Sequence, residues 1–341
     1  MDRRAFLAAT GAAALAGSAA AQPRGPLLRP AMLRPGDRVA LVNPSTALHD
    51  PAAETRARAV VEALELTPVV YPGFLNRPRD YAASVRLRLD ELHRAFSDPT
   101  IKGVFSGRGG YGVSEIVDRV DYGLIRRNPK VLVGFSDTTL LQLAIQKRSG
   151  LSTFHGRMAA LTGFSDYSLQ ALRRAVMSPE PLGVLPTPAE ANPLRPTYPL
   201  QTITPGTATG PLVGGNLSMI AAAMGTPWEI DTRGAIFFFE DVEEAPYSIA
   251  RMLLNLRHAG KLQAAAGILV GACARCEGPL DASPYTLNEV FDHLLGDLKI
   301  PVFAGLPIGH TTDQLTLPIG ASARLDATGR TLTVLEPGVT A

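Results

Sequence analysis

The stretch KVLVGFSDTTLL, from Lys130 to Leu141, determines both the expected fold and the first functional hypothesis. An apolar, β-rich run leads into a Gly-Phe-Ser-Asp turn, and a helical pattern follows. Ser136 therefore falls at a strand-to-helix corner, where its hydroxyl would project from the carboxyl edge of a sheet and the Asp137 amide would begin a helix. This placement is typical of a nucleophilic serine. The alternative is that Ser136 or Asp137 only caps the helix.

Strand and helix patterns alternate on both sides of this corner. RVALVN (Arg38 to Asn43) is typical of a short buried strand, and IKGVFS (Ile101 to Ser106) is another, with amphipathic helical patterns between the strands. Strands separated by helices of this length form parallel sheets, and ligands gather at the carboxyl ends of such strands. We therefore predict an α/β fold with a site near Ser136.

The 341 residues are 46% hydrophobic and 19% charged, which is sufficient for two globular domains. Residues 178–211 carry nine prolines and no clear periodicity, so we predict an inter-domain linker there, with room for short edge strands. The N-terminal domain is expected over residues 22–177 and the C-terminal domain over residues 212–341. The formal net charge of +2 gives no strong field for nucleic acid, so we expect a small-molecule partner.

The N-terminus resembles an export signal. An Arg3-Arg4 pair precedes a short Ala-rich apolar stretch that ends in Ala19-Ala20-Ala21 before Gln22. We expect a twin-arginine signal peptide over residues 1–21 and a periplasmic mature protein. The apolar stretch is too short and weak to span a bilayer stably, although an uncleaved signal anchor is the alternative.

The only two cysteines, Cys273 and Cys276, form a C-x-x-C pair. A redox pair and half of a zinc site are the functional interpretations, but a structural metal site usually needs four ligands, and no His or Cys lies nearby to complete one. We favour two cysteines at a strand end that are able to form a local disulfide. The sequence predicts no metal and no cofactor.

The loop from Gly107 to Gly112 satisfies G-x-G-x-x-G, so a dinucleotide site is one hypothesis. That motif normally follows the first strand of its domain, whereas at least two strand-helix patterns precede this loop. We favour a different use, in which bare backbone amides at Gly109 and Gly110 approach a reacting carbonyl. Together with the Asp137 amide they would form an oxyanion hole.

Two further residues could complete a catalytic triad. His310 lies in PIGHTTDQ, at the end of a predicted strand, and Glu240 ends the apolar strand AIFFFED. A triad needs a nucleophile, a base that takes its proton and an acid that orients the base, and Ser136, Glu240 and His310 occur in a compatible order. The alternatives are a structural histidine and an ion pair between Glu240 and Arg251.

At this point the chain resembles the LD-carboxypeptidases, serine peptidases of the murein tetrapeptide carboxypeptidase type. The resemblance covers roughly Leu33 to Glu336. It rests on six ordered motifs: RGGYG (108–112), GFSDTT (134–139), HGRM (155–158), GGNLS (214–218), FEDVEEAPYSIARML (239–253) and GLPIGH (305–310).

The resemblance implies a Ser-Glu-His triad at Ser136, Glu240 and His310, an oxyanion hole near the RGGYG loop and Asp137, and no metal. It also implies a homodimer whose protomers have a Rossmann-like N-terminal domain with a parallel sheet and a β-rich α/β C-terminal domain. The family commonly has His-Gly-Pro where this chain has Arg157 as the third residue. Arg157 would therefore alter the substrate rim or be a surface substitution.

The leading hypothesis is a periplasmic serine carboxypeptidase that releases terminal D-alanine from murein tetrapeptides. A carboxypeptidase must recognise a free carboxylate, for which Arg108 and the glycine-loop amides are suited. Asn216 could donate to the substrate backbone, or it could be a helix N-cap. The alternatives are hydrolysis of peptidyl or aminoacyl nucleotide antibiotics, a catalytically silent periplasmic peptide-binding protein, and a nucleotide-dependent oxidoreductase.

Overall fold

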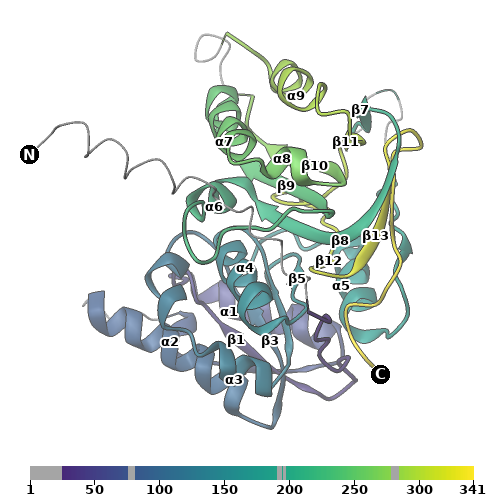
Figure 1. The fold of residues 1–341 in the computed structure, drawn as a ribbon. Coiled ribbons are helices and arrows are strands. Elements are labelled where there is room, and N and C mark those ends of the chain that lie inside the picture. Colours follow the sequence, from purple (N-terminus) through teal and green to yellow (C-terminus); the bar gives the residue numbers. More distant parts are fainter. Residues whose placement is uncertain (1–24, 76–80, 190–193, 195–196, 278–283) are drawn as a thin grey trace, which may run out of the picture.

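The computed structural model describes residues 25–75, 81–189, 194, 197–277 and 284–341. The predicted signal peptide lies outside these residues. The described chain contains two sheets with helices packed on them, the N-terminal sheet in the lower half of Figure 1 and the C-terminal sheet in the upper half. No helix among the described residues is long and apolar enough to cross a membrane.

The first sheet is parallel except at one edge, as the alternating pattern predicts. Its strand order is β12-β5-β4-β3-β1-β2, and only β12 runs antiparallel to its neighbour. The strands are β1 (Arg38–Val42), β2 (Thr67–Val70), β3 (Ile101–Ser106), β4 (Val131–Gly134), β5 (Phe154–His155) and β12 (Leu317–Pro318). The inner strands β1, β3 and β4 are almost wholly buried because helices cover both faces of the sheet.

Local signals explain where the helices of this half begin and end. Asp50 caps the first one by accepting from the Ala52 amide, with Pro51 in its first turn, and the helix after β4 ends at Gly150 in the left-handed conformation. The helices are α1 (Pro51–Ala63), α2 (Tyr81–Ser97), α3 (Tyr122–Arg127), α4 (Thr138–Ser149) and α5 (Asp166–Met177), with 3₁₀ turns η1 (Pro72–Phe74), η2 (Val113–Glu115) and η3 (Val117–Arg119).

The second sheet is mixed. Its order is β6-β14-β13-β8-β9-β10-β11-β7, with β8 to β11 parallel and the outer strands antiparallel. The strands are β6 (Gly183–Val184), β7 (Gln201–Thr204), β8 (Thr207–Asn216), β9 (Ile236–Val242), β10 (Gly267–Ala274), β11 (Val302–Ala304), β13 (Ser322–Asp326) and β14 (Thr331–Val334). The helices are α6 (Leu217–Ala222), α7 (Pro246–His258), α8 (Lys261–Ala264) and α9 (Leu287–Leu295).

Strand β9 lies at the centre of the second sheet. Phe237 and Phe239 face one hydrophobic cluster, and Phe238 faces the other, so the unbroken apolar run reflects burial on both faces. The fold class is thus confirmed: a Rossmann-like parallel sheet precedes a β-rich α/β half.

Two local expectations differ from the structure. The proline-rich stretch contains the edge strands β6 and β7, as the pattern allows, but also the beginning of β8. The apolar run before His310 is a strand only at β11, so His310 does not end a strand. It lies in a connection, residues 305–316, that leaves the second sheet at β11 and joins the first at β12. We call this segment the His310 loop.

Candidate active site

Ser136 occupies the corner between β4 and α4. Its φ is +59°, a left-handed value that is rare for a residue with a side chain and is found at strained functional turns. The capping alternative does not describe the corner, because Asp137 makes no side-chain cap bond to α4. Its carboxylate instead accepts from the Val113 amide at 3.0 Å. Burial raises the pKa of the Asp137 carboxyl.

His310 lies between the serine and a buried acid. Its Nε2 is 3.1 Å from Oγ of Ser136, and its Nδ1 is 2.7 Å from Oε2 of Glu240. An ionised carboxylate only accepts, so this pairing places the proton on Nδ1 and leaves Nε2 to accept from the serine hydroxyl. The ring of Phe135 packs on the imidazole at a centroid distance of 4.7 Å. The structure thus brings together the three residues expected to form the triad.

Glu240 is fully buried on β9, with an exposed fraction of 0%. Burial raises the pKa of its carboxyl, and hydrogen bonds from His310 and Asn216 oppose that rise. The ion-pair alternative is not what the structure shows, since the Arg251 guanidinium lies over the Tyr247 ring, 5.5 Å from its centroid. Glu240 therefore faces His310.

A glycine permits the close approach of Glu240 and the His310 loop. Gly309 has φ +109°, and a Cβ at this position would lie 2.3 Å from Oε2 of Glu240. Any side chain would therefore strain the backbone and displace the carboxylate that His310 contacts.

The glycine loop packs directly against Ser136. A Cβ on Gly109 would lie 2.9 Å from the Ser136 Oγ, so a side chain there would collide with the nucleophile. Within the described residues, the amides of Gly109, Gly110 and Asp137 donate to no acceptor. The loop is held at its far end by Thr46, whose Oγ1 accepts from the Tyr111 amide at 2.9 Å.

The same loop does not have the form of a dinucleotide site. That fingerprint needs an α-helix N-terminus to receive the pyrophosphate. Here the loop is followed by η2, a single 3₁₀ turn, and β3 is the third strand of its half. These features disfavour the oxidoreductase hypothesis.

A cavity of about 280 Å³ opens at Ser136 and His310. Arg108 lines it, and its guanidinium makes no hydrogen bond or ion pair within the described part of the chain. Arg56 of α1 lines it too, held by the Ala160 carbonyl oxygen at 3.1 Å and by Asp50 at 2.9 Å. Sequence reasoning missed Arg56, because nothing in the α1 pattern separates it from the solvent-facing arginine two residues later.

Asn216 matches the helix-cap alternative in its geometry. Its Oδ1 accepts from the Met219 amide at the start of α6, at 3.2 Å, and its Nδ2 donates to Asp241 at 3.0 Å. It is buried beside Glu240, its neighbour on the adjacent strand. This places Asn216 behind the acid and not at the cavity wall.

Cys273 lies at the end of β10, as expected, and the two cysteines are free thiols in this structure. Cys273 pairs with Asp241 across β10 and β9, close to Glu240, and the Cys273 and Cys276 thiols contact each other. Among the residues described, no group of three or more His, Cys, Asp or Glu side chains could hold a metal ion.

Sequence comparison places both halves in one family. The profile of the LD-carboxypeptidase N-terminal domain matches residues 39–156, and that of the C-terminal domain matches residues 209–325. A probable murein peptide carboxypeptidase of Bacillus subtilis is 36% identical over 312 residues, which cover 91% of this chain and 95% of the relative.

Solved structures agree with this assignment. The muramoyltetrapeptide carboxypeptidase of Oxalobacter formigenes superposes with a TM-score of 0.76 at 28% identity, covering 89% of this chain and all of that one. The microcin C7 self-immunity protein MccF, in complex with adenosine monophosphate, gives a TM-score of 0.81 at 23% identity, covering 92% and 100%, and shares the fold. With its two domain profiles in order and relatives aligned over nearly its whole length, this chain belongs to the LD-carboxypeptidase family of serine peptidases.

Proposed function

We propose that this protein is a serine carboxypeptidase that hydrolyses the L,D bond of murein tetrapeptides and releases the terminal D-alanine. The observation that carries the proposal is the hydrogen-bonded series from Ser136 through His310 to the buried Glu240. The names of the Bacillus and Oxalobacter relatives support the choice of a murein peptide as substrate.

In the proposed reaction, Nε2 of His310 takes the Ser136 proton as Oγ attacks the carbonyl carbon before D-alanine. Glu240 holds the imidazole through Nδ1–H and stabilises the imidazolium that forms. The negative charge on the carbonyl oxygen is stabilised by the amides of Gly109, Gly110 and Asp137. The imidazolium then protonates the leaving amine, which breaks the peptide bond and leaves an acyl-serine that water hydrolyses with His310 as base.

Recognition of the free carboxylate is assigned to Arg108. Its guanidinium lines the cavity and has no hydrogen-bond partner among the residues that the structure describes, so it is able to form two parallel hydrogen bonds with a carboxylate. Arg56, on the same cavity, has its charge partly balanced by Asp50 and supports the site as a second cation. Two cations beside the nucleophile suit an exopeptidase substrate, which is anionic at its terminus.

The direct test measures free D-alanine released by the purified protein from a murein tetrapeptide. We expect turnover that falls sharply when the terminal carboxylate is amidated, because Arg108 then loses its anionic partner. Equal rates on both peptides would contradict carboxylate recognition.

One alternative substrate class is an aminoacyl or peptidyl nucleotide, because MccF, which has the same fold, is solved in complexes with adenosine monophosphate and with aspartyl sulfamoyl adenosine. Turnover of such a conjugate, with none of the tetrapeptide, would replace the murein assignment while keeping the same catalytic residues.

Export by the twin-arginine route and homodimer formation are further parts of the proposal. Export rests on Arg3, Arg4 and the Ala19-Ala20-Ala21 end of the leader. Replacing both arginines by lysine should leave the protein in the cytoplasm, and unchanged periplasmic recovery would contradict this route.

Light scattering during gel filtration should give twice the mass of the chain, and a monomer mass would contradict the dimer.

A further inference from the structure

Arg157 lies two residues after the end of β5 and is buried, with an exposed fraction of 7%. It is therefore neither a surface substitution nor an open part of the substrate rim. Burial lowers the pKa of its guanidinium, which the negative charge of Asp313 opposes. Within the described residues Arg157 makes no ion pair, and its Nε has no hydrogen-bond partner. Burying a charged guanidinium costs desolvation free energy, so the hydrogen bonds that it makes in the protein must offset that cost.

The guanidinium joins two segments of the active site. One terminal nitrogen, Nη1, donates to the carbonyl oxygen of Thr311, the residue after His310. The other, Nη2, donates to the carbonyl oxygen of Thr162, which lines the cavity at Ser136. The ring of Phe164 stacks against the same group at 5.7 Å. One planar side chain thus connects the base to the wall of the substrate cavity.

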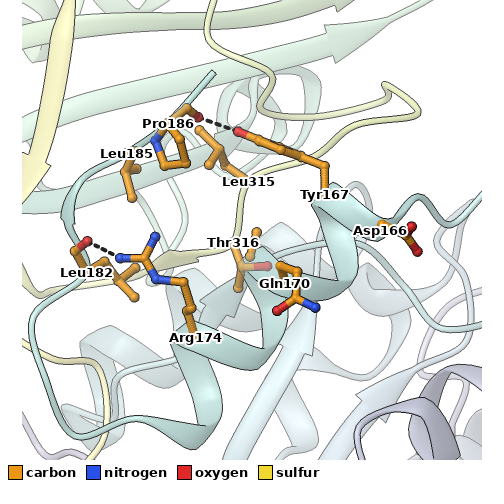
Figure 2. Close-up of a pocket in the computed structure, with 10 residues that line it drawn as sticks. Asp166, Tyr167, Gln170, Arg174, Leu182, Leu185, Pro186, Leu315 and Thr316 are labelled. Carbon is orange, nitrogen blue, oxygen red and sulfur yellow. Dashed lines mark hydrogen bonds between the residues drawn. The ribbon is translucent and has the colours of Figure 1, made fainter. Parts of the chain in front are cut away.

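Apart from the contacts of His310 itself with Ser136 and Phe135, the other hydrogen bonds from the His310 loop to this half of the molecule lie further along the chain. Ser168 of α5 donates to the Thr312 carbonyl oxygen at 3.0 Å and accepts from the Gln314 amide at 2.8 Å. Leu315 and Thr316 then lie against α5, in the pocket shown in Figure 2. Among the hydrogen bonds that hold the loop residues on either side of His310 to this half, the bond from Arg157 to Thr311 is therefore the closest to His310.

We propose that Arg157 is a positioning residue for catalysis, which keeps the His310 imidazole at hydrogen-bond distance from Ser136. The proposal rests on the proposed Ser136–His310 pair but not on the identity of the substrate. A guanidinium is suited to this role because its two terminal nitrogens hold two carbonyl oxygens in a fixed geometry, whereas the ammonium group of a lysine is a single point charge.

The test compares Arg157→Met, which keeps the apolar stem, with Arg157→Lys, which keeps the charge and can reach one carbonyl. Each is reacted with a fluorophosphonate, which phosphonylates an activated serine with loss of fluoride, and is assayed on the tetrapeptide. A misplacement of the base by about 1 Å costs about 100-fold, so we expect both kcat and the phosphonylation rate of Arg157→Met to fall by about that factor. KM should change by less than about threefold, since the cavity wall remains, and Arg157→Lys should recover part of the rate.

Arg174→Met is the matched control. Arg174 lies on α5 and donates to the Leu182 carbonyl oxygen (Figure 2) at a distance of 2.5 Å, and within the described residues it makes no hydrogen bond to the His310 loop. Its removal also deletes an arginine-to-carbonyl bond, and we expect wild-type phosphonylation and kcat.

The outcomes separate this inference from the proposed function. A wild-type protein that does not react with the fluorophosphonate would contradict serine catalysis itself, whereas reaction without tetrapeptide cleavage would contradict only the substrate. Wild-type phosphonylation in folded Arg157→Met, or a change in KM alone, would overturn the positioning role. Circular dichroism at the assay temperature shows which variants are folded. If Arg157→Met does not fold, wild-type rates in Arg157→Lys would overturn the proposal that the Arg157 guanidinium positions His310.

Discussion

The nucleophile and the base are held in different ways. Ser136 is fixed by its immediate neighbours, since β4 ends at Gly134 and α4 begins at Thr138. His310 lies within the twelve-residue connection from 305 to 316, and its partners are 70 and 174 residues distant in sequence. One half of the site is thus formed by local structure and the other by tertiary contacts alone. Four predictions test this difference.

The largest effect is expected at the locally formed corner. Ser136→Ala should lower kcat by about four to six orders of magnitude without loss of the fold. Ser136→Gly should be equally inactive but more stable than Ser136→Ala by roughly 1 kcal/mol, because glycine adopts φ +59° without strain. Kinetics and thermal unfolding of both variants check this. Substantial activity in either variant would show that Ser136 is not the nucleophile. Equal stability of the two variants would show that the backbone at this corner is not strained.

The next effect concerns the acid that orients the base. Glu240→Gln keeps the volume of the side chain but lets an amide donate to Nδ1 and favour the wrong tautomer. By analogy with other triad acids, kcat should fall by roughly 10³- to 10⁴-fold with little change in KM. If Glu240 is only structural, the variant should instead lose about 1 to 3 kcal/mol of stability and stay active. Measuring kcat and Tm on one preparation distinguishes the two, and the second outcome would make Glu243 and Glu244 the next acids to test.

A smaller effect should follow from disturbing the tertiary contact that Gly309 permits. Gly309→Ala places a Cβ against the Glu240 carboxylate and strains the backbone, so we expect kcat to fall by about 10- to 100-fold. Gly225→Ala is the control, because Gly225 also has positive φ, at +76°, but nothing lies within 4 Å of its added Cβ. Equal kcat in the two variants would mean that the approach of the loop to Glu240 is not critical.

The last prediction changes stability rather than turnover. His155 is buried between Phe135 and Phe238, and burial lowers its pKa to about 3. Below about pH 6.5 the unfolded chain binds a proton at His155, whereas in the folded chain His155 stays neutral down to about pH 3. Stability should therefore fall as pH drops from about 6.5 to about 3, by up to about 1.4 kcal/mol per pH unit from this residue. His155→Phe removes this titration, so its urea unfolding free energy should depend less steeply on pH. Identical slopes in the two proteins would contradict a neutral buried His155.

The difference between local structure at Ser136 and tertiary contacts at His310 also explains which parts of the fold and the site can be predicted from the sequence. The Ser136 corner, the buried strand ending near Glu240 and the parallel first sheet are recognisable because hydrophobic period and turn residues are local signals. The end of β11 is not recognisable, because the apolar run continues to His310 whereas the strand ends at Ala304. Tertiary packing and strand pairing decide where such a short apolar segment leaves the sheet.

Arg56 and Arg157 could not be placed for a related reason. An arginine after a strand, or on the polar face of a helix, is usually solvent-exposed. Only the folded chain shows that the Arg157 guanidinium lies between Thr162 and Thr311, and that Arg56 lines the cavity at Ser136.

The division of the site between two sheets has a consequence for protein synthesis. Ser136 emerges from the ribosome 174 residues before its base, and Glu240 emerges 70 residues before that base. A nascent chain that has folded only β1 to β5 of its first sheet carries a serine without a proton acceptor, because His310 and the edge strand β12 are synthesised later. Because His310 is synthesised last of the three residues, the protein can hydrolyse a substrate only when translation is nearly complete and the second sheet has docked.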